Sequence, residues 1–149
     1  MTYEWGYTYS ESMPVSPLNK VEGVLKYAVS EIPSNKILMG IPNYGYDYTL
    51  PYEKGKAAKS LTIDDARTLA FNNNAEIKYY KEAETPYFKY KKDDILHEVQ
   101  YDNAYSFYKK LELIEEYNLG GISIWTLKTF NQTYYTLLSH YFEIKKNKS

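Results

Sequence analysis

Apolar residues recur at the spacing of a helix in three stretches of the chain. The first stretch follows Ser16 and Pro17, which match a hydroxyl N-cap and a proline at the first helical position, and it ends before Pro33. The second begins near Ala104, and the third covers residues 132–142. The apolar positions are Val21, Val24, Leu25, Ala28, Val29 and Ile32; Ala104, Phe107, Tyr108, Leu111 and Ile114; and Tyr134, Leu137, Leu138 and Tyr141. The pattern predicts three helices, each with one buried face.

Three short segments rich in apolar, β-branched and aromatic residues predict strands, at residues 1–5, 37–44 and 121–127. Side chains alternate between the two faces of a strand. Tyr3 and Trp5 are therefore expected on one face and Glu4 on the other. Because helices separate these strands, we expect parallel pairing through right-handed crossovers, as in an α/β protein.

The alternation of strand and helix stops between Gly45 and Asn103. Residues 62–65 (Thr-Ile-Asp-Asp) resemble a capping box with Asp in place of Glu, and they open a short helix that ends at the asparagines of residues 72–74. Strands are then predicted at residues 76–80, 87–91 and 96–101, with a hairpin turn at residues 92–94. The pattern indicates an α+β insertion over residues 46–102, between α/β parts at 1–45 and 103–149.

The composition excludes several kinds of partner. The 149 residues carry a formal net charge of −1 with mixed signs, so we expect neither nucleic-acid nor anionic-membrane binding. The lysines at 145, 146 and 148 are interpreted as a solvated end. There is no cysteine, so no disulfide or thiolate metal site is expected, and no stretch is apolar enough to span a membrane. His97 and His140 have no paired ligand in the sequence, and we expect no cofactor and no metal.

Four stretches together resemble glycoside hydrolase family 18, in the order in which the family has them. They are MTYEWGYTY at residues 1–9, MPVSPLNKVEGVLKYAVSEIPSNKILMGIPNYGYDYTLPY at 13–52, HEVQYDNA at 97–104 and GGISIWTL at 120–127. Within the family they are most similar to the spore-germination and cortex-lytic branch, whose members cut bacterial peptidoglycan. The resemblance implies the last three strands, six to eight, of a (β/α)8 TIM barrel. It also places the α+β insertion after the seventh strand, as one wall of the substrate cleft.

One family motif does not occur in the chain. The signature DxxDxDxE, which carries the catalytic glutamate on the fourth strand, is absent, and the pairs Asp64-Asp65 and Asp93-Asp94 lack its alternate spacing. A complete barrel also needs about 250 residues. We therefore interpret the chain as the C-terminal part of the family's catalytic domain, which needs the missing N-terminal part of the barrel as its partner and is inactive alone. Unpaired strand edges also predict possible self-association.

The resemblance assigns roles to residues at the strand ends. Family 18 enzymes retain the anomeric configuration, and the substrate's own 2-acetamido oxygen is the nucleophile. Tyr3 matches the tyrosine that donates a hydrogen bond to the acetamido carbonyl. Glu4 matches an acidic residue that accepts from sugar hydroxyls or the acetamido N–H, with a structural salt bridge as the alternative. Trp125 matches the apolar floor beneath the sugar at the cleaved bond.

Further residues are assigned to the cleft with less support from the motifs. Met1, Asn43 and Tyr44 are expected to line it, and Trp5 and Tyr46 to add aromatic surface. Ordinary core packing is the alternative for each aromatic side chain, because large aromatic residues are usually buried.

The implied substrate is a polymer that contains N-acetylglucosamine, with peptidoglycan favoured over chitin. It implies action outside the cytoplasm, at a bacterial cell wall or spore envelope. Two other functions stay open at this point. The chain can be a non-catalytic, lectin-like carbohydrate-binding module, or a structural piece that completes a barrel supplied by another chain.

Overall fold

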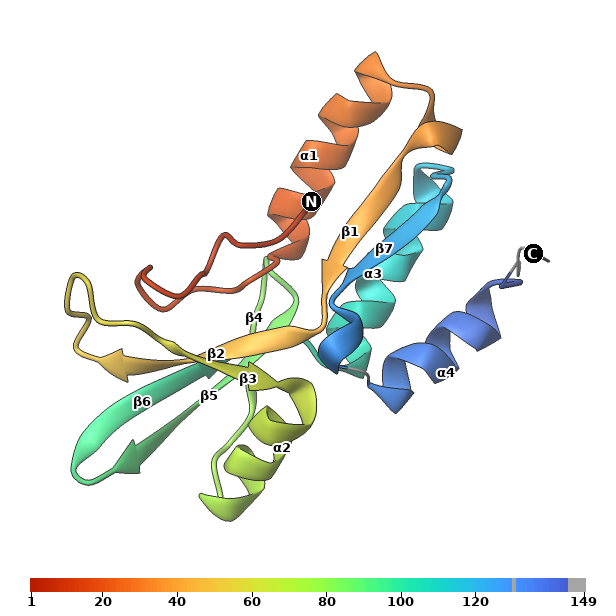
Figure 1. Ribbon diagram of the computed structural model, residues 1–149. Coiled ribbons are helices and arrows are strands. Elements are labelled where there is room, and N and C mark those ends of the chain that lie inside the picture. The colour runs from red at the N-terminus through yellow and green to blue at the C-terminus, as the bar shows by residue number, and fades with distance from the viewer. Residues whose placement is uncertain (130, 145–149) are drawn as a thin grey trace.

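The computed structural model describes residues 1–129 and 131–144, and the lysine-rich end lies outside them (Figure 1). The described part is a mixed α/β fold with a two-stranded parallel sheet and a five-stranded antiparallel sheet, neither of which closes on itself. The parallel pair is β1 (Leu38–Pro42) and β7 (Gly121–Trp125), with Leu38 opposite Gly121 and Pro42 opposite Trp125. The predicted parallel pairing of these two strands is confirmed.

Two helices pack on this parallel pair. They are α1 (Leu18–Glu31) and α3 (Ala104–Glu116), which lie beside β1 and β7 in Figure 1. Their apolar faces join the strands in one buried cluster that includes Val21, Leu25, Met39, Ile41, Phe107 and Leu111. A third helix, α4 (Gln132–Tyr141), packs against α3 and buries Tyr134. The predicted helices are present, but the predicted burial of Val24, Ile32, Ala104 and Tyr141 is wrong, since these residues are exposed at the edge or end of their stripes.

The five-stranded sheet forms the second region. Its strand order is β3 (Lys59–Thr62), β2 (Tyr44–Leu50), β6 (Ile95–Gln100), β5 (Thr85–Lys92) and β4 (Lys78–Tyr80). The helix α2 (Ile63–Asn72) begins at Thr62, whose side chain and that of Asp65 form the predicted capping box. The turn at Asp93 and Asp94 has positive φ at both residues, as a tight hairpin requires. The inserted helix and three of the strands were predicted, whereas β2 and β3 were not.

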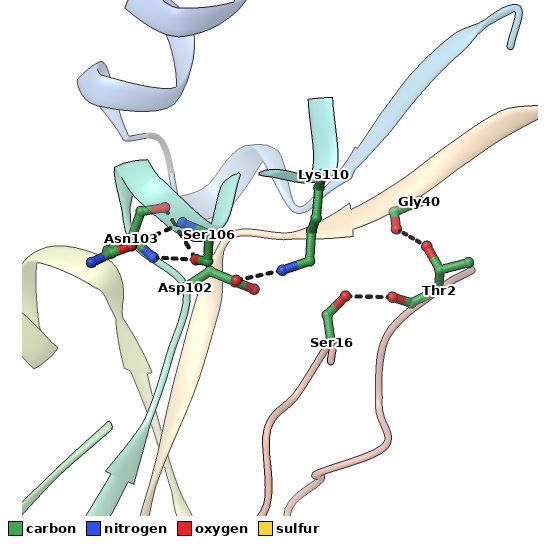
Figure 2. A network of polar contacts seen from close by, with 7 residues as sticks. All are labelled: Thr2, Ser16, Gly40, Asp102, Asn103, Ser106 and Lys110. Atoms are coloured by element: carbon green, nitrogen blue, oxygen red, sulfur yellow. Dashed lines mark hydrogen bonds and ion pairs between the residues drawn. The ribbon is translucent and has the colours of Figure 1, made fainter. Parts of the chain in front are cut away.

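No strand forms at residues 1–5, so the predicted first strand is wrong. The backbone N–H of Trp5 donates to the carbonyl of Val15 at 3.1 Å, so this segment pairs with the loop before α1 instead of forming a ladder with β1. It reaches β1 through a side chain, because the Thr2 hydroxyl donates to the carbonyl of Gly40 at 2.6 Å (Figure 2). The segment is thus held beside β1 without being part of the sheet.

The predicted cap of α1 is also wrong. The Ser16 hydroxyl donates to the Thr2 carbonyl at 2.6 Å, and Pro17 occupies the N-cap position without a side-chain bond (Figure 2). The first helical N–H, that of Leu18, donates to the carbonyl of Ala83 at 2.9 Å. Ser16 therefore fixes the N-terminal segment, and the insertion satisfies the helix end.

A buried ion pair ties the end of β6 to α3. Lys110 donates from Nζ to Oδ1 of Asp102 at 2.5 Å, and each residue is only 1% exposed (Figure 2). Asp102 directly precedes the cap of α3, where Asn103 and Ser106 bond each other's backbone N–H groups. The two short helical turns are η1 (Ser34–Lys36) and η2 (Leu127–Thr129). None of the described helices has the length and apolarity needed to cross a bilayer.

Candidate active site

An open cleft of about 560 Å³ lies at the carboxyl ends of β1 and β7, where the parallel pair meets the antiparallel sheet. It is lined by Met1, Tyr3, Glu4, Tyr44, Tyr46, Ser60, Trp125, Thr126, Lys128 and Thr129. The structure therefore brings together most of the side chains that the sequence assigned to a cleft. A larger hollow of about 710 Å³ lies over α2, and none of those assigned side chains lines it.

The backbone at Glu4 places two neighbouring side chains in the same cleft. Glu4 has a φ of 69°, in the left-handed region, and this breaks the alternation of an extended strand. Tyr3 and Glu4 consequently both line the cleft. Trp5 instead lines a separate hollow with Met13. The expectation that Tyr3 and Trp5 share one face is wrong for this reason.

Two tyrosines from β2 hold the carboxylate of Glu4. Tyr44 and Tyr46 both donate from Oη to Oε1 of Glu4, the second at 3.1 Å. Their rings lie on one face of β2 and meet edge to face, with centroids 5.7 Å apart. Burial raises the pKa of Tyr44 well above its ordinary value, and the hydrogen bond to Glu4 adds to this effect. Burial is also the largest cause of the raised pKa of Tyr46. Both phenols are therefore neutral donors near neutral pH.

Tyr3 is half-buried beside this cluster. Its hydroxyl has no hydrogen-bond partner within residues 1–129 and 131–144, so it is available to a ligand in the cleft. Burial raises the pKa of Tyr3, and the negative charge of Glu4 raises it further. Its ring rests against β1 at Gly40, where an added Cβ would lie 3.0 Å from Cε1 of Tyr3. The missing side chain of Gly40 thus lets the tyrosine ring and the N-terminal backbone approach the strand.

Trp125 ends β7 at the opposite side of the same cleft, and its side chain is 60% exposed. So large an exposed aromatic surface at a cleft offers a flat apolar face to a ligand. Among the described residues, Trp125 is therefore not packed in the core.

Asn43, which the sequence assigned to the cleft lining, lies behind the cleft. It is only 4% exposed, does not line the cleft, and has its amide turned toward Thr126 and Thr129. Its expected contact with substrate is not supported by this placement. The cleft in turn includes four polar residues that the sequence did not suggest, namely Ser60, Thr126, Lys128 and Thr129. Ser60 lies on the unpredicted strand β3, and Lys128 lies in a turn with no periodicity to mark it.

His97 lies on the insertion sheet, outside the cleft lining. Its Nδ1 is 2.9 Å from Oδ1 of Asp47, and Tyr90 donates from Oη to Oδ2 of the same aspartate at 2.6 Å. These contacts account for His97 as a structural residue. Residues 1–129 and 131–144 contain no group of three or more His, Cys, Asp or Glu side chains that could hold a metal ion.

Comparison with known proteins agrees with this geometry. The cortical fragment-lytic enzyme of Bacillus subtilis (strain 168) is 43% identical over 148 residues, which cover 98% of this chain and 34% of that enzyme. The crystal structure of the Bacillus cereus spore cortex-lytic enzyme SleL matches with a TM-score of 0.95 at 37% identity, over 98% of this chain and 34% of that one. A chitinase from Chromobacterium violaceum ATCC 12472 matches with a TM-score of 0.84 at 29% identity, over 93% and 43% of the two chains.

The chain thus spans about a third of the length of the cortical fragment-lytic enzyme that it matches. Within that span, the model of the family described as glycosyl hydrolases family 18 matches residues 1–129, which include all of the cleft residues. The chain belongs to glycosyl hydrolase family 18.

Proposed function

We propose that this chain is the C-terminal part of a family 18 catalytic domain that hydrolyses β-1,4 bonds beside N-acetylglucosamine in bacterial peptidoglycan, outside the cytoplasm. In this proposal β1 and β7 are the seventh and eighth strands of a TIM barrel, and residues 46–102 are the insertion between them. One observation carries the proposal. The cleft places the exposed ring of Trp125 together with the free hydroxyl of Tyr3 and the tyrosine-held carboxylate of Glu4.

These three groups match the parts of an N-acetylglucosamine unit. The ring of Trp125 covers the apolar face of the sugar and the acetamido methyl group. The Tyr3 hydroxyl donates to the acetamido carbonyl and aligns its oxygen with the anomeric carbon. A phenol with a raised pKa does this without a competing charge. Glu4 accepts from the acetamido N–H or a sugar hydroxyl, and Tyr44 and Tyr46 fix its orientation.

The remaining chemistry belongs to residues outside this chain. The substrate's acetamido oxygen attacks the anomeric carbon while a carboxylic acid protonates the leaving oxygen, and water later opens the oxazolinium intermediate. The chain holds no DxxDxDxE motif to supply that acid. It therefore contributes the floor and one wall of the cleft, and the N-terminal part of the barrel contributes the proton donor.

The test is direct binding of sugar to the 149-residue chain. The chain has two tryptophans, so in a Trp5→Phe background Trp125 is the sole tryptophan and its fluorescence reports the cleft. We expect chitotetraose and muropeptide glycan strands to change this emission saturably, and cellotetraose, which lacks acetamido groups, to bind more weakly. In the chain that keeps Trp5, the Trp125→Ala substitution should abolish sugar binding measured by calorimetry. Equal binding of cellotetraose and chitotetraose, or unchanged affinity in Trp125→Ala, would contradict the proposal.

A lectin-like role is the second candidate, and it rests on one observation. The cleft offers an exposed tryptophan ring beside hydrogen-bonding groups, which is enough to bind a glycan without cutting it. The reading frame immediately upstream of Met1 separates the two roles. An in-frame DxxDxDxE supports the hydrolase, a substituted motif supports the lectin, and a separate half-barrel gene supports a chain that completes another protein's barrel.

A further inference from the structure

Asn43 lies at the joint between β1 and β2, with Pro42 before it and Tyr44 after it. Its backbone N–H donates to the carbonyl of Trp125 at 3.1 Å. Its side chain makes four hydrogen bonds to the turn that follows Trp125. From Nδ2 it donates to the carbonyls of Thr126 and Thr129 at 2.7 and 2.8 Å, and at Oδ1 it accepts from the Thr126 N–H and the Thr129 hydroxyl, each at 2.7 Å.

These bonds use the whole capacity of the side chain. An asparagine amide has two N–H groups and an oxygen with two lone pairs, and all four are engaged here. A buried amide in this state has nothing left to offer a sugar. Asn43 therefore acts on the cleft through the turn and not by touching substrate.

The turn itself has few other anchors. In the described part of the chain, the remaining hydrogen bonds of Thr126 and Thr129 lie within the turn, and the side chains of Leu127 and Lys128 are exposed. The ring of Trp125 is also mostly exposed, so packing does little to orient it. Its direction is set by the ladder with β1 on one side and by the turn held by Asn43 on the other.

We infer that Asn43 is a positioning residue that sets the direction of the Trp125 ring and so the affinity of the cleft for N-acetylglucosamine polymers. The next residue along the chain, Tyr44, donates to Glu4, so one peptide orients both the aromatic floor and the carboxylate. The link to sugar affinity rests on the proposed function, whereas the link to the tryptophan does not.

The experiment uses the 149-residue chain with Trp5→Phe, in which Trp125 is the sole tryptophan. Three further variants are compared. Asn43→Leu removes all four side-chain bonds, and Thr129→Val removes only one of them, together with the bond from the Thr129 hydroxyl to the Thr126 carbonyl within the turn. Asn103→Ala is the matched control, since it removes the side-chain cap of α3 and a hydrogen bond to Tyr79 without touching the turn. Fluorescence anisotropy and acrylamide quenching of Trp125 are measured without ligand, and chitotetraose is then titrated.

We expect Asn43→Leu to lower the anisotropy, to raise the quenching constant and to weaken chitotetraose binding by about tenfold or more, because misplacement by about 1 Å is enough for losses of this size. Thr129→Val should give smaller changes of the same sign, and it decides the matter if Asn43→Leu does not fold. Asn103→Ala should lower only the melting temperature.

Unchanged anisotropy and quenching in the folded variants would overturn the inference. An altered tryptophan signal with no sugar binding in any variant, the parent included, would overturn the proposed function and leave the positioning of Trp125 standing. If the anisotropy and the quenching of Trp125 changed as much in Asn103→Ala as in Asn43→Leu, the inference would also be overturned, because the effect would then come from lower overall stability.

Discussion

The parallel pair and the antiparallel sheet differ in how completely they are covered. In the antiparallel sheet, β2, β6 and β5 each have neighbours on both edges, and Phe88 and Val99 are fully buried. In the parallel pair, β1 and β7 each have one free edge among the described strands. Leu38 on β1 and Trp125 on β7 are more than half exposed. Three strands of the antiparallel sheet therefore have a partner on both edges, whereas neither strand of the parallel pair does.

The cleft lies where these two regions meet. The antiparallel sheet supplies Tyr44 and Tyr46, which are buried, and the parallel pair supplies Trp125, which is exposed. Neighbouring strands on both edges thus hold β2 and its tyrosines, and the exposed end of β7 leaves the cleft open to solvent. From this difference we expect the antiparallel sheet to open less readily than the parallel pair.

The largest effect is expected on the rate of hydrolysis by the chain alone. The isolated chain should hydrolyse N-acetylglucosaminyl substrates at least ~10²–10⁴-fold more slowly than the intact enzyme, because it has no acid to protonate the leaving oxygen. Release of reducing ends from cortex peptidoglycan measures this, and co-expression with the N-terminal part of the barrel should restore turnover. Sustained turnover by the purified chain alone, at the rate of an intact enzyme, would contradict this prediction.

The next largest effect is expected at the buried ion pair of Asp102 and Lys110, which ties the end of β6 to α3. Lys110→Met leaves Asp102 charged and unpaired in the interior, and it should lower the free energy of unfolding by about 3–5 kcal/mol. Urea unfolding of the single and double variants is the measurement. Replacing both residues, Lys110→Met with Asp102→Leu, should recover most of the loss because no buried charge is left over. Additive losses in the double variant would show that the pair is not coupled.

A smaller effect is expected from one hydroxyl in the cleft. Tyr3→Phe in the intact enzyme keeps the ring that packs on Gly40 and removes the donor to the acetamido oxygen. If that bond strengthens as charge develops, kcat should fall about 10²-fold while KM changes little. The steady-state constants must come from variants with matched melting temperatures. Near-normal kcat would make Tyr3 a packing residue.

The smallest effect is expected at the N-terminus of α2, where Thr62 lies opposite Tyr44 in the β2–β3 ladder but does not itself line the cleft. Thr62→Ala removes the side-chain acceptor that caps α2 and should cost about 1 kcal/mol of stability. Thr62→Ser keeps the hydroxyl and is the matched control. Thermal unfolding measures both, and chitotetraose affinity should be unchanged in each. A loss of affinity in Thr62→Ala would mean that the cap of α2 also helps to position Tyr44 in the cleft.

The sequence predicts the helices and strands whose apolar residues recur at one regular spacing or form one short run. The helices α1 and α3 and the strands β1 and β7 follow from one-faced stripes and short apolar runs. The strand β2 was missed because it is buried on both faces and its tyrosines are neither plainly apolar nor plainly polar. The segment at residues 1–5 has a strand's composition, but a strand is defined by its pairing, and here the backbone pairs elsewhere.

The candidate site was predictable in its members more than in their geometry. Trp125 and Tyr3 were found through motifs at the ends of strands, and both line the cleft. The left-handed backbone of Glu4 leaves no mark in the sequence, because glutamate has no preference for positive φ. Asn43 was assigned to substrate for being polar at a strand end. Whether such a side chain turns outward or back onto a neighbouring turn depends on that neighbour, which lies more than eighty residues away.

The buried pair of Asp102 and Lys110 also constrains how this sequence can change by descent. A single replacement at either position leaves an unpaired charge in the interior, whereas a matched double replacement leaves none. The path between two well-folded sequences therefore passes through a poorly folded one. Lineages of this family should keep both residues or exchange both, so the two positions behave as one inherited character although eight residues separate them in the sequence.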